Sequence, residues 1–104
     1  MEPADPDLNL DRLVHEPGRL AILTVLSSIK SADFTFLQQT TGLTKGNLSS
    51  HLTKLEEAGL LTIDKRFVRK KSQTTASLTK VGRQRIEAHW RQLDKLRGQF
   101  SPGG

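Results

Sequence analysis

Hydrophobic residues recur along the chain first with helical spacing. Four apolar residues between positions 8 and 14 predict a short first helix that ends at Pro17. Pro17 also suits the first turn of a second helix. This second helix is apolar over most of its circumference, so we expect it to be the central core helix. The apolar residues of these two helices are Leu8, Leu10, Leu13, Val14, Leu20, Ile22, Leu23, Val25 and Leu26.

A pair of short helices is predicted next. Asp33 can cap a helix of about two turns that carries Phe34, Phe36 and Leu37, and Gly42 can end it in the left-handed conformation. Thr44 can cap another helix, which ends at Gly59. Two helices joined by such a tight turn form a helix-turn-helix pattern.

The pattern then changes from helical spacing to strand-like alternation. In LLTIDKRF, residues 60–67, Leu61, Ile63 and Phe67 fall on one face, and we expect Phe67 to anchor the strand to the core. A polar turn, RKKSQ, separates this strand from a second one, TTASL. We expect a β-hairpin with residues 70–72 near its tip. Thr79 then caps a long last helix with an apolar stripe formed by Ile86, Trp90, Leu93 and Leu96.

The 104 residues are enough for one small domain of the α+β class, mostly helical. We expect flexible ends at residues 1–7 and 98–104 and a folded domain at 8–97. The N-terminal residues are acidic and the longest apolar run is short, so we expect neither a signal peptide nor a membrane span. The chain has no cysteine, and its three histidines are scattered, so we predict no metal, no cofactor and a cytoplasmic location.

Charge divides the chain into two unlike halves. Residues 1–42 carry three Lys/Arg against six acidic residues, a net charge of −3, while residues 43–104 carry thirteen against five, a net charge of +8. The segment KRFVRKK, residues 65–71, contains five Lys/Arg and no acid. This asymmetry favours a polyanionic partner for the C-terminal half, although an ordinary soluble surface would explain the composition equally well.

The predicted fourth helix has an outer face suited to a DNA major groove. Leu48, Leu52 and Leu55 form its buried seam at about 100° per residue. Its first two turns otherwise expose small or hydrogen-bonding residues and no acid, and such side chains can approach base edges and phosphates. A plain amphipathic helix with a polar face is the alternative. His51 lies at the edge of the seam, which favours a packed histidine over a base contact and makes it only a marginal candidate for DNA contact.

The order of elements and the stretches HEPGRLAIL, DFTFLQQTTGLTKGNLSSHLTKLEEAGLL, KRFVRKKSQTT and LTKVGR resemble the winged helix-turn-helix regulators of the MarR and ArsR type. The resemblance covers roughly residues 8–97. It implies a three-helix core, a two-stranded β-wing and a long C-terminal helix. It also implies a prokaryotic, nucleoid-associated transcriptional regulator that binds double-stranded DNA as a homodimer on a near-palindromic operator.

The resemblance also assigns residues by position. Groove or phosphate contacts from the recognition helix fall on Thr44, Lys45, Gly46, Asn47, Ser49, Ser50, His51 and Lys54. Wing contacts fall on Arg66, Arg69, Lys70 and Lys71. The dimer interface falls on Leu10, Leu13, Ile86, Trp90, Leu93 and Leu96. Arg69 and Ser72 occupy places where such wings often have Gly and Pro, which leaves the shape of the wing tip open.

Three other interpretations were weighed. A winged-helix module that binds an acidic protein would share the basic face, but it would not need small hydrogen-bonding residues in groove geometry. An enzyme has no support, because the sequence lacks a nucleophile elbow, a phosphate loop and a metal signature. The apolar stripe of the last helix could pack on the chain's own core instead of on a second copy. A small-molecule effector, which the sequence does not identify, would either bind at the dimer interface or be absent.

Overall fold

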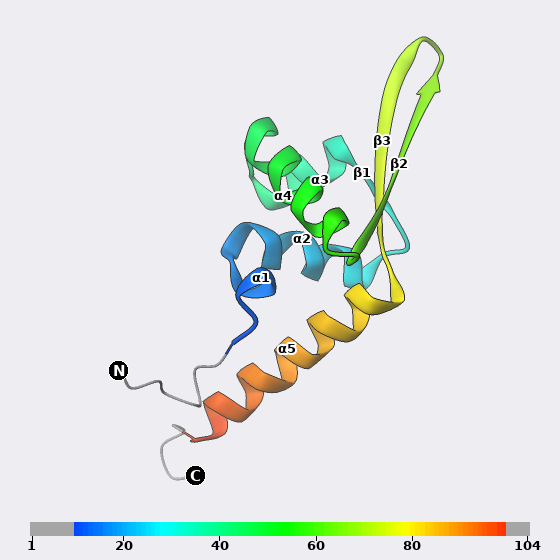
Figure 1. Ribbon diagram of the computed structural model, residues 1–104. Helices are drawn as coiled ribbons and strands as arrows, with labels where there is room; N and C mark the ends of the chain where they lie inside the picture. Colours follow the sequence, from blue (N-terminus) through cyan, green and yellow to red (C-terminus); the bar gives the residue numbers. More distant parts are fainter. Residues whose placement is uncertain (1–9, 100–104) are drawn as a thin grey trace.

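The computed structural model describes residues 10–99, which form five helices and a three-stranded antiparallel sheet (Figure 1). In chain order the elements are α1 (Arg12–His15), α2 (Pro17–Ser28), β1 (Ala32–Asp33), α3 (Phe34–Thr41), α4 (Lys45–Glu57), β2 (Leu61–Val68), β3 (Lys71–Leu78) and α5 (Lys80–Gln99). The hairpin of β2 and β3 extends well beyond the helical body. This is the winged helix architecture that the sequence predicted.

The helix boundaries follow the predicted caps. The Asp33 carboxylate accepts a hydrogen bond from the Phe36 amide at 2.8 Å, and Gly42 ends α3 with a φ of 76°. The Thr44 hydroxyl accepts from the Asn47 amide at 3.2 Å, so Thr44 caps α4 as expected. Each such contact satisfies a backbone donor that the first helical turn leaves unpaired.

The boundaries at the two chain ends differ from those expected. Leu10 precedes the four-residue α1, and Leu8 lies outside the described residues. The helix α5 continues through Gln99, two residues beyond the predicted end of the domain. The other residues expected to be flexible, 1–7 and 100–104, also lie outside the described part of the chain.

The sheet contains a strand that the sequence pattern did not predict. The two-residue β1 pairs with β3 through Ala32↔Ala76 and Asp33↔Thr75, which gives the order β1-β3-β2. A two-residue strand cannot show alternation, so only its partner identifies it. Pairing covers the outer edge of β3 at its base and ties the hairpin to the helix-turn-helix unit.

The wing strands are longer and the turn is shorter than expected. The strands pair from Leu61↔Leu78 to Val68↔Lys71, so Lys71, Ser72 and Gln73 belong to β3 and not to a loop. The turn consists of Arg69 and Lys70 alone, with φ values of 50° and 64°. Two consecutive left-handed residues are the geometry of a type I′ turn, whose twist matches that of the flanking strands.

The core lies between α2, the helix-turn-helix unit, the base of the sheet and the first half of α5. Its fully buried members include Ile22, Leu23, Leu37, Leu48 and Leu55. Ile86 is also fully buried there, which corrects its assignment to a dimer interface. Phe67 corrects the opposite expectation, because its side chain is 75% exposed and does not reach the core.

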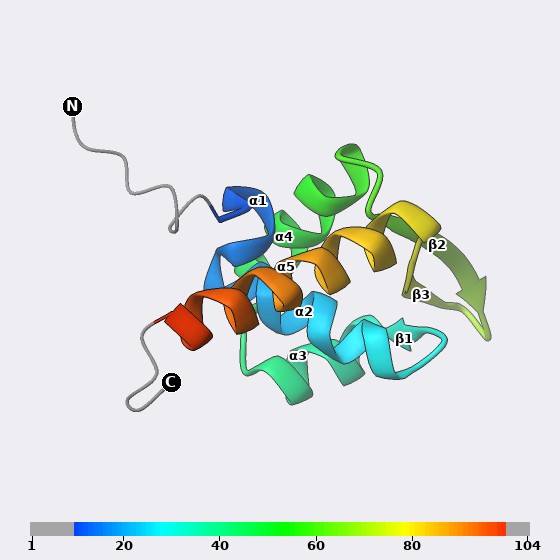
Figure 2. The ribbon, with the colours of Figure 1, turned by 90° about the horizontal axis from the view of Figure 1, so that it is seen from below.

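The long helix α5 crosses beneath α2 and beside α1 (Figure 2). Thr79 caps it by accepting from the Gly82 amide at 3.0 Å, and the Thr79 hydroxyl donates to the Gly59 carbonyl at 2.6 Å. A Cβ on Gly82 would lie 2.1 Å from the Leu60 carbonyl oxygen. Glycine is therefore required where the start of α5 meets the end of the helix-turn-helix unit.

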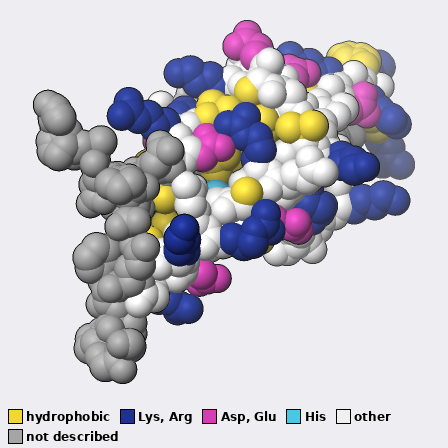
Figure 3. All heavy atoms as spheres, turned by 60° about the horizontal axis from the view of Figure 1, so that its bottom comes forward, with side chains coloured by type: hydrophobic (Ala, Val, Ile, Leu, Met, Phe, Trp, Pro, Cys, Tyr) yellow, Lys and Arg dark blue, Asp and Glu magenta, His cyan; other side chains and the backbone are white. Residues whose placement is uncertain are grey.

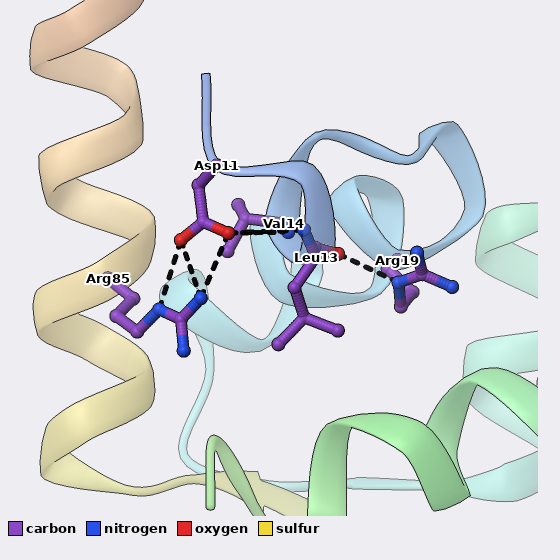
Figure 4. A network of polar contacts seen from close by, with 5 residues as sticks. All are labelled: Asp11, Leu13, Val14, Arg19 and Arg85. Carbon is purple, nitrogen blue, oxygen red and sulfur yellow. Dashed lines mark hydrogen bonds and ion pairs between the residues drawn. The ribbon is translucent and has the colours of Figure 1, made fainter. Parts of the chain in front are cut away.

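A charged contact joins α1 to α5 (Figure 4). The Asp11 carboxylate accepts three hydrogen bonds of 2.7 to 3.0 Å from the Arg85 guanidinium. The same carboxylate caps α1 by accepting from the Leu13 and Val14 amides. Burial would raise the Asp11 pKa, but the hydrogen bonds from Arg85 and Val14 and the charge of Arg85 outweigh it and lower this pKa. The ionised pair therefore holds α1 against α5.

Candidate nucleic-acid interface

The helix α4 presents the exposed face that the sequence predicted. Leu48, Leu52 and Leu55 are buried against the body of the domain. Its first turn contains no acidic residue. The six predicted contact residues on its outer side are all exposed: Lys45, Gly46, Asn47, Ser49, Ser50 and Lys54. Thr44 is also exposed, although its hydroxyl is occupied as the helix cap. The start of α4 therefore combines free backbone amides with small polar side chains and a cation, which suits an approaching phosphate or base edge.

The wing supplies a second group of positive charges. Lys65, Arg69, Lys70 and Lys71 are exposed, and none of them forms an ion pair with the residues described here. Arg66 differs, because its Nε lies 2.6 Å from the Asp64 carboxylate. An exposed pair of this kind contributes little to stability. Most of the wing's positive charge is therefore available to a partner.

The two faces of the wing are not equivalent. A hollow between α4 and the hairpin is lined by Ser49 and Thr53 on one side and by Ile63, Lys65 and Thr74 on the other. By strand alternation, Arg66 and Lys71 lie on the opposite face. The structure therefore brings Lys65 to the α4 side and leaves Arg66 away from it.

Lys65 is absent from the wing contacts that the resemblance implies, which fall on Arg66 and on the cations nearer the tip. Its place in the sequence between Ile63 and Phe67 on the alternating pattern was an available signal. Strand alternation assigns Lys65 to the inner face without reference to charge density.

His51 packs against the start of α2. Its Nε2 lies 3.6 Å from the Glu16 carboxylate, and its Nδ1 lies 3.3 Å from Nη1 of Arg19. Arg19 Nε also donates to the Leu13 carbonyl at 2.7 Å. The hydrogen bond from the Arg19 backbone amide lowers the Glu16 pKa, and the nearby charges of His51 and Arg19 lower it further. Burial acts in the opposite direction but does not outweigh them. These contacts favour packing over a base contact for His51.

Partly exposed apolar residues lie on α5 and near α1, away from α4 and the wing. Trp90 packs against the core but stays half-buried, whereas Leu93 and Leu96 lie farther along α5 outside that core. Leu10 is also half-buried, and Leu13 packs on the core. Figure 3 shows hydrophobic side chains gathered on this lower face among Lys and Arg side chains. This surface lies away from the wing and leaves the exposed side of α4 free.

His15 and His89 meet where α1 packs on α5. Nδ1 of His15 lies 3.0 Å from Nε2 of His89, while the buried Nδ1 of His89 has no hydrogen-bond partner among the described residues. Burial and the charge of His15 lower the His89 pKa, against the opposing effect of Asp11. Within residues 10–99 no group of three or more His, Cys, Asp or Glu side chains is arranged to hold a metal ion.

Comparison with known proteins identifies the fold as a known DNA-binding one. A profile described as the winged helix DNA-binding domain matches residues 19–96. The chain belongs to this family. An uncharacterized protein of Methanocaldococcus jannaschii is 35% identical over 65 residues, which are 62% of this chain and 71% of that protein. The family is a DNA-binding one, and it gives no support to an enzymatic function.

Solved structures show the same winged helix fold. A transcriptional regulator homologue from Pyrococcus horikoshii superimposes with a TM-score of 0.81 at 26% identity, covering 88% of this chain and 90% of that one. A MarR-family regulator from Silicibacter pomeroyi gives 0.67 at 20% identity, covering 88% and 61%. NadR in complex with 4-hydroxyphenylacetate gives 0.71 at 23% identity, covering 90% and 64%. These solved structures, one of them a MarR-family regulator, therefore share the winged helix fold of this chain.

In the described part of the chain, no helix has the length and apolar character needed to cross a membrane.

Proposed function

We propose that this winged helix protein is a homodimeric transcriptional regulator that binds double-stranded DNA at a near-palindromic operator in the cytoplasm. The observation that carries the proposal is the acid-free, exposed start of α4 beside a wing with four cations that form no ion pair with the residues the structure describes. The similarity to the Pyrococcus horikoshii regulator homologue supports it. A homodimer would duplicate this surface on two half-sites.

In this proposal α4 supplies sequence specificity and the wing supplies affinity. Asn47, Ser49 and Ser50 contact base edges, since amide and hydroxyl groups can donate to and accept from bases in the major groove. Lys45 and Lys54 contact phosphates or guanine, and the exposed Gly46 allows close approach. The wing cations, Arg69, Lys70 and Lys71 with Lys65, neutralise phosphates and orient the domain.

The dimer is proposed to form through the apolar side of α5 together with Leu10 and Leu13. Two α4 helices spaced by about 34 Å would then enter successive major grooves on one side of the DNA. A small-molecule effector would bind at this dimer interface. NadR, solved in complex with 4-hydroxyphenylacetate, is a precedent for ligand binding by a protein with this fold.

Selection of bound sequences from random DNA tests the proposal directly. The selected sites should be inverted repeats with half-sites about one helical turn apart. If each dimer neutralises roughly six phosphates, the logarithm of the affinity should fall with the logarithm of salt concentration at a slope of about −5. Failure to select any sequence, or binding that does not change with salt, would refute this function.

The double variant Lys70→Glu, Lys71→Glu tests the wing. It should weaken operator binding by a factor on the order of 100 and reduce the salt slope, because two phosphate contacts per protomer become repulsive. The matched control is Lys30→Glu, Lys95→Glu, which makes the same charge change at exposed positions outside α4 and the wing. Equal losses in the two variants would show that net charge alone, and not the wing, controls affinity.

A further inference from the structure

The wing carries a large apolar side chain close to its tip. Phe67 is 75% exposed and the neighbouring Val68 is 44% exposed. Phe67 pairs across the hairpin with Ser72, whose small side chain covers little of the ring. An aromatic ring left in water gives up the favourable free energy that its burial would provide. The position of Phe67 therefore calls for a partner that covers it.

Phe67 lies on the face of the wing that continues from α4. Alternation along β2 places it on the side of Ile63 and Lys65, which line the hollow shared with α4. The ring thus stands beyond this hollow towards the hairpin tip, on the same side as the proposed recognition surface. A molecule bound to α4 and the wing together would meet Phe67.

Positive charge lies beside this ring. Lys65 lies on the same face of β2 as Phe67, Arg69 and Lys70 form the adjoining turn, and no acidic residue interrupts residues 65–71. An apolar centre with a cationic rim complements a DNA minor groove, in which sugar C–H groups form the walls and phosphates form the edges. Proteins that bind the minor groove use apolar side chains in this way to unstack base steps partly.

We propose that Phe67 is an apolar wedge that enters the minor groove beside the half-site contacted by α4 and bends the DNA there. This inference rests on the proposed function, since it requires that the wing meet DNA. It adds a source of sequence preference that needs no hydrogen bond to a base. Pyrimidine–purine steps such as TA and CA unstack easily, whereas A-tracts are stiff. The wing should therefore prefer a flexible step at its contact point.

The test compares the purified full chain with its Phe67→Ala variant on a selected operator. Two versions of that operator carry a TA step or an A-tract at the wing position. Phe67→Ala should lose affinity on the order of tenfold on the TA operator, because apolar contact is removed. Its salt slope should equal that of the original chain, because no charge changes. The preference for TA over the A-tract should disappear, and energy transfer between labelled DNA ends should show a smaller bend.

Val81→Ala is the matched control. Val81 is 50% exposed on α5, away from the wing tip, and its truncation should leave affinity and bending unchanged. Phe67→Ala binding with unchanged affinity and unchanged TA preference would overturn the wedge. A loss of affinity accompanied by a smaller salt slope would overturn it too, because the ring would then act only by placing cations. Loss of self-association in Phe67→Ala would assign the ring to a protein interface and contradict the proposal.

These outcomes are separate from those that test the proposed function. If the unsubstituted chain selects no operator, the function itself is wrong. If it binds an operator as expected and Phe67→Ala behaves identically, only the wedge is wrong.

Discussion

At the scale of single residues, His89 shows how burial changes what a side chain can do. Its ring is 1% exposed, and its contact with His15 joins two elements that are 74 residues apart in the sequence. A protonated His89 would place a positive charge in the buried junction of α1 and α5, where its Nε2 lies 3.0 Å from Nδ1 of His15. Asp11 offsets this cost only in part, because its carboxylate is held by Arg85. The neutral ring is therefore the form that the fold stabilises.

The lowered His89 pKa predicts a pH-dependent stability. Below the ordinary pKa of 6.5, the unfolded chain binds a proton that the folded chain does not. The free energy of unfolding should therefore fall as pH drops from 7 to 5, by at most about 1.4 kcal/mol per pH unit from this group. His89→Leu should flatten this dependence in urea unfolding curves recorded across that range.

Asp11 provides an internal reference for that measurement. Its lowered pKa contributes stability above its ordinary value of 3.8, and this contribution disappears as pH falls below that value. The slope below pH 4 should thus persist in His89→Leu. Equal slopes between pH 7 and 5 in the two proteins would contradict the role assigned to His89.

At the scale of elements, the wing turn combines positive charge with an unfavourable backbone. Arg69 and Lys70 both have left-handed φ values, a conformation that costs residues with a Cβ about 1 kcal/mol or more each. Asn-Gly is the pair that favours such turns. The turn therefore has two cations where stability would favour Asn and Gly, which agrees with the proposed role of the wing in binding phosphate.

Replacing the turn by Arg69→Asn, Lys70→Gly should raise stability and weaken DNA binding together. We expect a gain of about 1 kcal/mol, slower hydrogen exchange of the Val68 and Lys71 amides, and a smaller salt slope in operator binding. Arg69→Gln, Lys70→Gln is the control, since it removes the same charges and keeps the strained backbone. If both variants were equally stable, the left-handed turn would not be a source of strain.

At the scale of the whole molecule, the proposed DNA surface and the proposed dimer surface lie on different sides. Leu93 and Leu96 are partly exposed beyond the core, so polar substitutions there need not disturb folding of the monomer. Ile86 and Trp90 are unsuitable for such a test, because Ile86 is buried and Trp90 packs on the core. The dimer can therefore be tested separately from the fold.

Leu93→Glu, Leu96→Glu should convert a dimer into a folded monomer in sedimentation experiments. Operator affinity should then fall about 100-fold or more, because the second half-site no longer benefits from being linked to the first. Gln84→Glu, Ala88→Glu introduces the same charges at exposed positions of α5 outside the apolar stripe and should remain dimeric. A monomeric parent chain at micromolar concentration would contradict the dimer.

Local patterns predicted most of the fold. Caps at Asp33 and Thr44, the left-handed Gly42 and the buried seam of α4 are properties of neighbouring residues, so the sequence alone located the helix-turn-helix unit. Strand alternation likewise located the wing. The exposed polar residues of α4 followed from helical periodicity, and the structure leaves them exposed as expected.

The features that failed or stayed open depend on residues far apart in the chain. Strand alternation predicted on which face of the wing Phe67 lies, but not how far it lies from the core. Phe67 is exposed because the wing extends past the helices that could cover it. Helical spacing grouped Ile86 with Leu93 and Leu96, but only the first half of α5 meets the core, so one stripe is buried at one end and partly exposed at the other.

By itself the sequence determined the order of helices and strands, the basic hairpin and the exposed polar face of α4, because these follow from short-range periodicity, capping and charge. Only the tertiary structure decided that β1 joins the sheet, that His15 meets His89, and that Phe67 faces solvent among cations. The physical reason is that strand pairing and burial depend on which distant segments fold back against a residue. The spacing of neighbouring residues does not encode how close those segments come.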